Sequence, residues 1–171
     1  NGHGSPFIRG FTGYRTLALI DGVRYNNSVY RDGPNEYFSL IDRDALERIE
    51  LIQGPSSVVF GNDSIGGTLN LITRPTGYLE REGFYSKQDL SYRYSSAENS
   101  HQARASYELG VGSDWGLRIG IGAREYGDVR SADIGTQENT GYSENSFDMR
   151  FDKSINDLWS LTAVHQQLGQ D

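Results

Sequence analysis

Beyond residue 83, apolar and polar side chains alternate along the chain with a period of two. In the segments 102–111 and 115–124, alanine, leucine, isoleucine and aromatic residues alternate with glutamine, glutamate, arginine and glycine. A run from Phe84 and a run over residues 147–152 repeat this pattern, and the segment 158–168 follows it less regularly. Because successive side chains of a strand point to opposite faces, each run predicts a β-strand with one apolar and one charged face.

The connections between these runs differ in length and favour a membrane β-barrel. Residues 96–99, 112–114 and 155–157 form short polar links, whereas residues 127–141 form a longer polar loop. Short periplasmic turns and longer external loops are typical of antiparallel transmembrane strands, and aromatic residues at strand ends suit the membrane interfaces. The aromatic residues in such positions are Tyr94, Trp115, Tyr126, Tyr142 and Trp159. Periodicity alone fits a soluble β-sandwich or adhesin equally well.

Five strands do not close a barrel that spans a bilayer, because open sheet edges are not tolerated in lipid. We therefore expect the strands that complete such a barrel to come from sequence outside this chain or from other chains.

The first part of the chain has a mixed pattern and predicts a small α+β unit. The apolar run 16–20, the dipeptide Asp21-Gly22 and the strand-like residues that follow predict a β-hairpin. Apolar residues in Ile41–Ile52 have near-helical spacing, which predicts a short helix capped by Asp42 or Asp44. A strand over residues 68–73 follows. We predict two domains, residues 1–76 and residues 77–171.

Composition narrows the class of protein. The 171 residues carry a formal net charge of −7, and 36% of them are hydrophobic. No apolar stretch is long enough for a membrane-spanning helix and no signal peptide is visible, but alternating barrel strands look hydrophilic on average. The absence of cysteine excludes disulfides and cysteine metal sites, and the acidic balance argues against binding of nucleic acid.

Five motifs in the first part resemble, in order and spacing, the plug domain of TonB-dependent receptors. They are Ile8-Arg9-Gly10-Phe11, Leu19-Ile20-Asp21-Gly22-Val23-Arg24, residues 46–55 with Gly54-Pro55, Val59-Phe60-Gly61, and residues 65–73 with Gly66-Gly67. The resemblance covers about the first 75 residues closely, and the rest by strand pattern and by its position after a plug. The expected fold is a membrane β-barrel fragment of antiparallel transmembrane strands that follows a small α+β plug domain.

The resemblance implies a barrel of about 22 strands that is occluded by the plug. It implies energised uptake, across the outer membrane of a Gram-negative bacterium, of a scarce ligand such as a ferric siderophore, haem or cobalamin. The implied partners are outer-membrane lipid, the small iron-containing ligand, and the TonB energy-transducing complex, which would bind through a segment before Asn1. Residues 4–10, 26–28 and 33–35 are most similar to the branch that binds haem and host iron proteins.

The loop after the hairpin holds the expected ligand contacts. In similar receptors this part of the plug rises toward the outside, and tyrosine, asparagine and arginine suit stacking, hydrogen bonding and contact with an anion. The candidate residues are Asn27, Tyr30, Arg31, Asn35 and Tyr37. The alternative is an ordinary polar loop that packs on the barrel wall.

A second set of polar residues is expected to hold plug and barrel together. The candidates are Arg9, Arg48, Gln53, Arg104 and Glu108. Similar receptors usually have arginine before the Gly-Pro, whereas this chain has Gln53, which offers only neutral hydrogen bonds. We expect the charged face of the strands to look into a lumen that the plug blocks, since an arginine or lysine on the lipid face costs about 2–4 kcal/mol at the midplane.

The sequence offers no sign of catalysis. It contains no recognisable nucleophile, metal constellation or catalytic dyad, and the Gly66-Gly67 pair lacks the lysine of a phosphate-binding loop. His3 is a candidate haem ligand, but a single histidine near the start of the chain is weak support. We therefore expect no enzyme and no intrinsic cofactor. Two alternatives remain: a plug-and-barrel receptor that binds or signals without transport, and a soluble all-β binding module.

Overall fold

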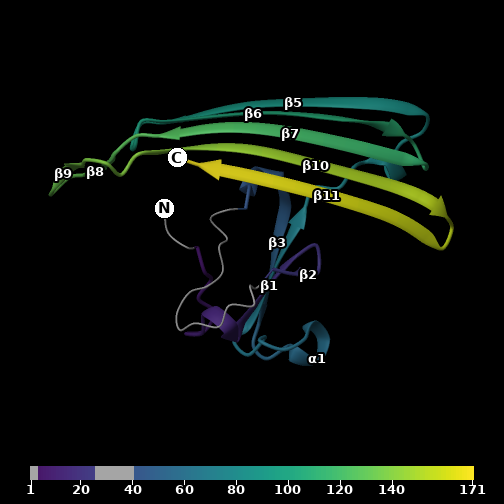
Figure 1. The fold of residues 1–171 in the computed structure, drawn as a ribbon, viewed down its shortest axis with the longest axis horizontal. Coiled ribbons are helices and arrows are strands. Elements are labelled where there is room, and N and C mark those ends of the chain that lie inside the picture. Colours follow the sequence, from purple (N-terminus) through teal and green to yellow (C-terminus); the bar gives the residue numbers. More distant parts are fainter. Residues whose placement is uncertain (1–3, 26–40) are drawn as a thin grey trace. The chain divides into compact units, whose positions relative to one another are not determined.

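The computed structural model describes residues 4–25 and 41–171, which form two compact units (Figure 1). The first unit ends at Arg74 and the second begins at Pro75. This division lies two residues before the domain boundary that we drew from the sequence.

The first unit is built on a mixed four-stranded sheet with the strand order β2-β1-β4-β3. Strand β1 pairs antiparallel with β2 and parallel with β4, and β3 pairs antiparallel with β4. Its elements in chain order are a 3-10 turn η1 (Gly13–Arg15), β1 (Thr16–Ile20), β2 (Val23–Arg24), a 3-10 turn η3 (Arg43–Ala45), β3 (Leu46–Gln53), α1 (Ser57–Phe60) and β4 (Gly67–Thr73).

The predicted hairpin is confirmed. Asp21 and Gly22 join β1 to β2 with φ angles of 49° and 79°, and two positive φ angles are the requirement of a type I′ turn. The Asp21 carboxylate accepts a hydrogen bond from the Thr73 amide at 2.8 Å, and the Gly22 amide donates to the Asn70 side chain at 3.1 Å. The turn is therefore fixed to strand β4 as well as to its own strands.

The helix predicted over Ile41–Ile52 is wrong, because residues 46–53 form strand β3. The register of β3 against β4 shifts between Leu46 and Arg48. One irregularity of this kind breaks the alternation of a strand, and the apolar residues then have nearly helical spacing. The expected cap exists on a smaller element: Asp42 accepts a hydrogen bond from the Asp44 amide at 3.1 Å and caps the 3-10 turn η3.

Hydroxyl groups fix the loop between β3 and β4. Ser64 and Thr68 are fully buried, and their hydroxyls lie 2.7 Å apart. The Ser56 hydroxyl lies 2.9 Å from that of Thr68, and the Ser56 amide donates to the Ser64 carbonyl at 3.1 Å. These contacts connect the loop that carries α1 to the buried strand β4.

The second unit is an antiparallel sheet of five long strands in the order β5-β6-β7-β10-β11 (Figure 1). Its elements are a 3-10 turn η4 (Tyr78–Glu80), β5 (Phe84–Ser95), β6 (Ser100–Val111), β7 (Trp115–Tyr126), β8 (Val129–Ser131), β9 (Gly135–Gln137), β10 (Tyr142–Asn156) and β11 (Trp159–Gln170). The five periodic runs are thus confirmed as strands. Strands β8 and β9 form a small hairpin within the predicted polar loop 127–141, a feature the sequence did not indicate.

The central strands of this sheet bury their charged face and expose their apolar face. Arg118 on β7 retains only 3% of its accessible surface, whereas Ile121 on the same strand retains 56% and Tyr107 on β6 retains 39%. A water-soluble sheet has the opposite arrangement, with apolar side chains inside. The sheet is therefore built to face hydrocarbon, and the alternative of a soluble module is wrong.

The described residues contain no helix that is long and apolar enough to cross a membrane.

Candidate functional site

Three ion pairs form a row on the buried face of the second unit, and we call this row the charged ladder. Arg118 lies 3.2 Å from Glu108, Arg124 lies 3.4 Å from Glu144, and Arg104 pairs with Asp148. Each of these side chains has at most 9% of its surface exposed. Buried charges are tolerated when they are paired and hydrogen-bonded, so the ladder is a structural network of mutually dependent groups.

Glycines on the central strand β7 make room for one of these pairs. Arg104 lies on β6 and Asp148 lies on β10, so their side chains meet across the strand between them. A Cβ atom at Gly120 would collide with the Arg104 guanidinium and the Asp148 carboxylate, and one at Gly122 would collide with the Ser146 hydroxyl. The glycines therefore let side chains two strands apart form a direct ion pair.

Two carboxylates hold residues 76 and 77, which precede the first strand of the second unit, and we call this arrangement the carboxylate clamp. Asp152 accepts hydrogen bonds from the Thr76 amide at 3.2 Å and from the Thr76 hydroxyl at 2.7 Å. Glu108 accepts a hydrogen bond from the Gly77 amide at 2.7 Å. The clamp thus fixes residues 76 and 77 to β10 and β6, although Thr76 and Asp152 lie 76 positions apart in the chain.

Asp152 is also the most heavily bonded acid of the clamp. Its carboxylate accepts from Arg150 Nε at 2.8 Å and from the Thr162 hydroxyl at 2.7 Å. Four hydrogen bonds therefore fix the orientation of this carboxylate. Asp152 therefore connects strands β10 and β11 to Thr76.

The buried face carries little net charge. On the three central strands, four arginines face four acids, so the formal charges cancel. The arginines are Arg104, Arg118, Arg124 and Arg150, and the acids are Glu108, Glu144, Asp148 and Asp152. The face therefore offers hydrogen-bonding groups without a strong electrostatic potential. Such a surface suits contact with a polar protein surface, whether that surface carries positive or negative charge.

The turn between β5 and β6 holds an acid whose titration is perturbed. The Glu98 carboxylate accepts hydrogen bonds from the Ser100 hydroxyl at 2.8 Å and from the Ser95 hydroxyl at 3.0 Å. Because these bonds favour the charged form, they lower the pKa of Glu98.

Within the described ranges, no group of three or more histidines and acids is arranged to hold a metal ion.

The candidate ligand residues Asn27, Tyr30, Arg31, Asn35 and Tyr37, and the candidate haem ligand His3, all lie outside the described residues.

The five residues expected to hold plug and barrel together lie in different settings. Arg9 occupies an exposed turn with φ of 54° between the bridged residues Ile8 and Phe11. Arg48 on β3 is exposed and pairs with Glu47 at 3.0 Å and with Glu50 at 2.9 Å.

The remaining three residues lie at the end of β3 and on β6. Gln53 is exposed at the end of β3, opposite Gly67. Arg104 and Glu108 are buried in the charged ladder, and Glu108 is also part of the clamp. The roles of Thr76 and Gly77 could not be predicted from the sequence, because only the fold brings these residues to their acidic partners.

The plug-domain match and the exposed apolar face of the strands define the class of protein. Residues 1–68 match the family model of the TonB-dependent Receptor Plug Domain, and the strands that follow are transmembrane strands by their exposed apolar face. The chain belongs to the TonB-dependent receptors of the outer membrane. The family resemblance, the fold class and the location expected from the sequence are therefore confirmed.

Three curated relatives show the range of this family. The chain is 31% identical over 159 residues to the vitamin B12 transporter BtuB of Vibrio vulnificus, covering 93% of this chain and 24% of that protein. It is 31% identical over 147 residues to the ferric enterobactin receptor of Pseudomonas aeruginosa, covering 81% and 19%. It is 46% identical over 71 residues to the iron-regulated outer membrane virulence protein of Vibrio cholerae, covering 39% and 11%. The chain thus spans about a quarter or less of the length of these relatives.

Solved structures agree on the fold. The copper transporter OprC superimposes with a TM-score of 0.77 at 19% identity, covering 99% of this chain and 25% of that one. The siderophore receptor PirA of Acinetobacter baumannii superimposes with a TM-score of 0.62 at 18% identity, covering 95% and 25%. At these identities the likeness establishes architecture alone.

Proposed function

We propose that this chain supplies the plug domain, residues 1–76, and the first barrel strands, residues 77–171, of a receptor for energised uptake of a scarce iron-carrying ligand. The ligand class is a ferric siderophore or haem. Energy reaches the plug from the TonB complex, and transport follows when the plug is partly remodelled.

The observation that carries this proposal is the sheet with an exposed apolar face and a buried charged face that follows the plug domain in the sequence. Its apolar face suits lipid, and its buried charged face suits a lumen filled by protein and water. The charged ladder is neutral as a whole, so its face suits contact with a polar protein surface without a large desolvated charge. In this proposal Arg9, Arg48, Gln53, Arg104 and Glu108 contribute to the contact of plug and barrel.

The iron-carrying ligand is favoured by two relatives. One is named an iron-regulated outer membrane protein and the other a ferric enterobactin receptor. Tyr30 and Arg31, with Asn27, Asn35 and Tyr37, provide aromatic surface, neutral hydrogen bonds and one cation for an anionic iron complex. We propose these five residues as ligand contacts.

A corrinoid is the second candidate ligand. The relative that matches 93% of this chain is named a vitamin B12 transporter. A corrinoid is large and bears many amides, and it would use the same tyrosines and asparagines without needing Arg31.

Uptake by cells that carry the full receptor tests both parts of the proposal. The cells receive labelled ferric enterobactin, haem or cyanocobalamin, in the presence and in the absence of a working TonB. We expect TonB-dependent uptake of an iron compound and a loss of at least about tenfold in apparent affinity for Arg31→Ala, since a charge-assisted contact is worth about 1.5–3 kcal/mol. Equal uptake with and without TonB would reject energised transport, and binding without any uptake would leave a binding or signalling receptor.

The choice of ligand follows from the same experiment. Arg43→Ala, an exposed arginine in the 3-10 turn η3, is the matched control for the removal of positive charge. TonB-dependent uptake of cyanocobalamin alone, unchanged by Arg31→Ala, would reject iron and support the corrinoid.

A further inference from the structure

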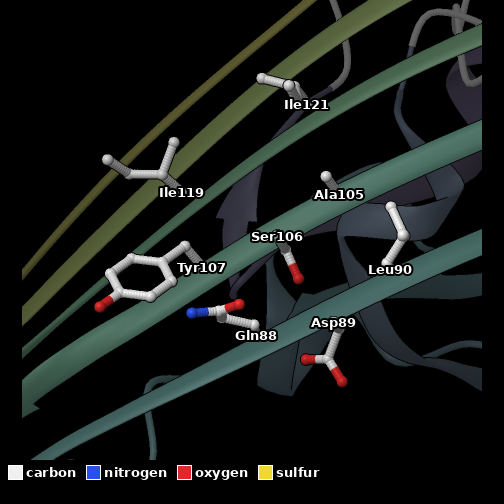
Figure 2. A pocket seen from close by; sticks show the side chains of 8 residues that line it. All are labelled: Gln88, Asp89, Leu90, Ala105, Ser106, Tyr107, Ile119 and Ile121. Carbon is white, nitrogen blue, oxygen red and sulfur yellow. The ribbon is translucent and has the colours of Figure 1, made fainter.

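The apolar face of the second unit is well suited to hydrocarbon over β6 and β7. Ala105 has Leu90 and Ile121 as its register partners, and in the neighbouring row Tyr107 pairs with Ile119 (Figure 2). Aliphatic and aromatic side chains in these rows fit a lipid environment. A strongly polar side chain at a similar depth is costly in lipid and indicates a neighbour other than lipid.

Strand β11 interrupts this pattern. His165 lies opposite Met149 of β10, and Gln167 lies opposite Phe147. Since these two partners continue the apolar rows of β7, the two polar side chains of β11 share the apolar face. Both are exposed, and methionine and phenylalanine offer them no strong hydrogen-bonding group. We call Ala163, His165 and Gln167, three successive residues of this face, the β11 strip.

The strip lies deep in the membrane. His165 is six positions beyond Trp159, where β11 begins, and tryptophan prefers the membrane interface. At a tilt of about 45°, six residues of strand rise about 14 Å, which is close to the middle of a hydrocarbon core of about 30 Å. Hydrocarbon offers no partner to an imidazole or an amide. A further strand paired with β11 would lie in the plane of the sheet, so it would leave this face uncovered.

A second copy of the receptor has the chemistry that fits the strip. Two copies in one membrane share their orientation, so a two-fold axis between them lies along the membrane normal and each residue meets its own counterpart at the same depth. The side chains of such a contact must therefore be complementary to themselves. A glutamine amide meets this requirement, because it both donates and accepts, and so does a neutral imidazole. A lysine or a glutamate in the same place would meet a like charge.

We propose that two copies of the receptor associate in the outer membrane through the β11 strip. The Gln167 amides of the two copies form a reciprocal pair of hydrogen bonds, the His165 rings lie beside them, and the small side chain of Ala163 lets the two sheets approach closely. Because the strands of each barrel are tilted, the two β11 strands cross and touch over a few residues only, which matches the short strip. The strip and the charged ladder occupy opposite faces of the sheet, so this contact needs no ligand.

Cysteine cross-linking of the full receptor in outer membranes tests this contact. One receptor carries Ala163→Cys in the strip, and its matched control carries Ala103→Cys, an exposed alanine on the same face of β6. The receptor without an added cysteine gives the background. After mild oxidation we expect a disulfide-linked receptor dimer for Ala163→Cys and only background for Ala103→Cys. Equal yields from the two positions, no dimer at all, or a link to a different protein would overturn the proposal.

Removal of the polar groups provides the second test. The full receptor is reconstituted into vesicles at decreasing ratios of receptor to lipid, and association is followed by energy transfer between labelled copies. His165→Leu combined with Gln167→Leu should raise the dissociation constant about tenfold, because hydrogen bonds between membrane segments are individually modest. Gln88→Leu, which removes an amide from the same face of β5, should leave the constant unchanged. All three changes place leucine on the apolar face, so the receptors should fold. Association of the double variant that is unchanged or tighter, or an equal weakening by Gln88→Leu, would refute the contact.

Discussion

The carboxylate clamp makes a prediction that separates two neighbouring amides. The Thr76 amide donates to Asp152, and the next amide, that of Gly77, donates to Glu108. Each amide exchanges with solvent only when its own hydrogen bond opens, so the exchange rates report the two halves of the clamp separately. The change that we consider first is Asp152→Asn, which keeps the shape of the side chain and removes its charge.

The size of the effect follows from the type of bond. A hydrogen bond to a charged group contributes about 1.5–3 kcal/mol, whereas a neutral one contributes about 1 kcal/mol. The asparagine side chain of this variant would retain one acceptor oxygen, so we expect the Thr76 amide to lose about 1.4 kcal/mol of protection and to exchange about tenfold faster. The Gly77 amide should change much less, because Glu108 remains.

Hydrogen exchange of the full receptor, measured by mass spectrometry with residue-resolved fragmentation over residues 75–80, is the assay. Glu108→Gln is the reciprocal change and should accelerate Gly77 more than Thr76. Thr76→Val is a further control, because it removes only the hydroxyl bond of 2.7 Å and leaves the amide bond to Asp152 in place. If Asp152→Asn accelerates both amides equally, or neither, the clamp does not act through two separate carboxylates and the reasoning is refuted.

Three further predictions concern other parts of the chain. Gly120→Val should break the Arg104–Asp148 pair and destabilise the receptor by about 3–5 kcal/mol in thermal unfolding, whereas Gly169→Val, which has open space around it, should have little effect. Gly22→Val should destabilise the plug by about 1–2 kcal/mol, because a β-branched residue is strained at φ of 79°; unchanged exchange of the β1 and β2 amides would contradict this. Because the pKa of Glu98 is lowered, the stability that its carboxylate adds to the β5–β6 turn is present above the ordinary pKa of 4.5 and is lost as the pH falls through the lowered pKa. Replacing Ser100 and Ser95 by alanine should raise the pKa of Glu98, as measured in a carboxyl titration.

The strands of the second unit were predictable because their signal is local. Alternation along β7 places Leu117 and Ile119 on one face and Arg118 on the other. This pattern is present in the sequence of the strand itself and does not depend on a partner strand. The ends of the strands were less predictable, because β10 extends from Tyr142 to Asn156, well beyond the regular run at 147–152. Most of the added residues are polar and become strand only by pairing with β7 and β11.

Strand β3 shows where local reasoning failed. Its register shift hides the period of two, and its identity as a strand depends on pairing with β4, about twenty residues later. The ion pairs and the clamp could not be predicted for a related reason. The sequence shows charged residues on one face, but the choice of Asp148 for Arg104 depends on the registers of β6, β7 and β10. The choice of Asp152 for Thr76 depends on where the fold places residue 76.

The glycines of β7 have a consequence for how substitutions combine. Effects of mutations usually add when the residues belong to strands that are not neighbours, since such side chains seldom touch. Here positions 104 and 148 should behave as one thermodynamic unit in a double-mutant cycle, and Gly120 determines whether they do. If the residues at positions 104 and 148 covary, the covariation is compatible with direct contact, although β6 and β10 are separated by β7. Interpreting such covariation as evidence that β6 pairs with β10 would give the wrong strand order.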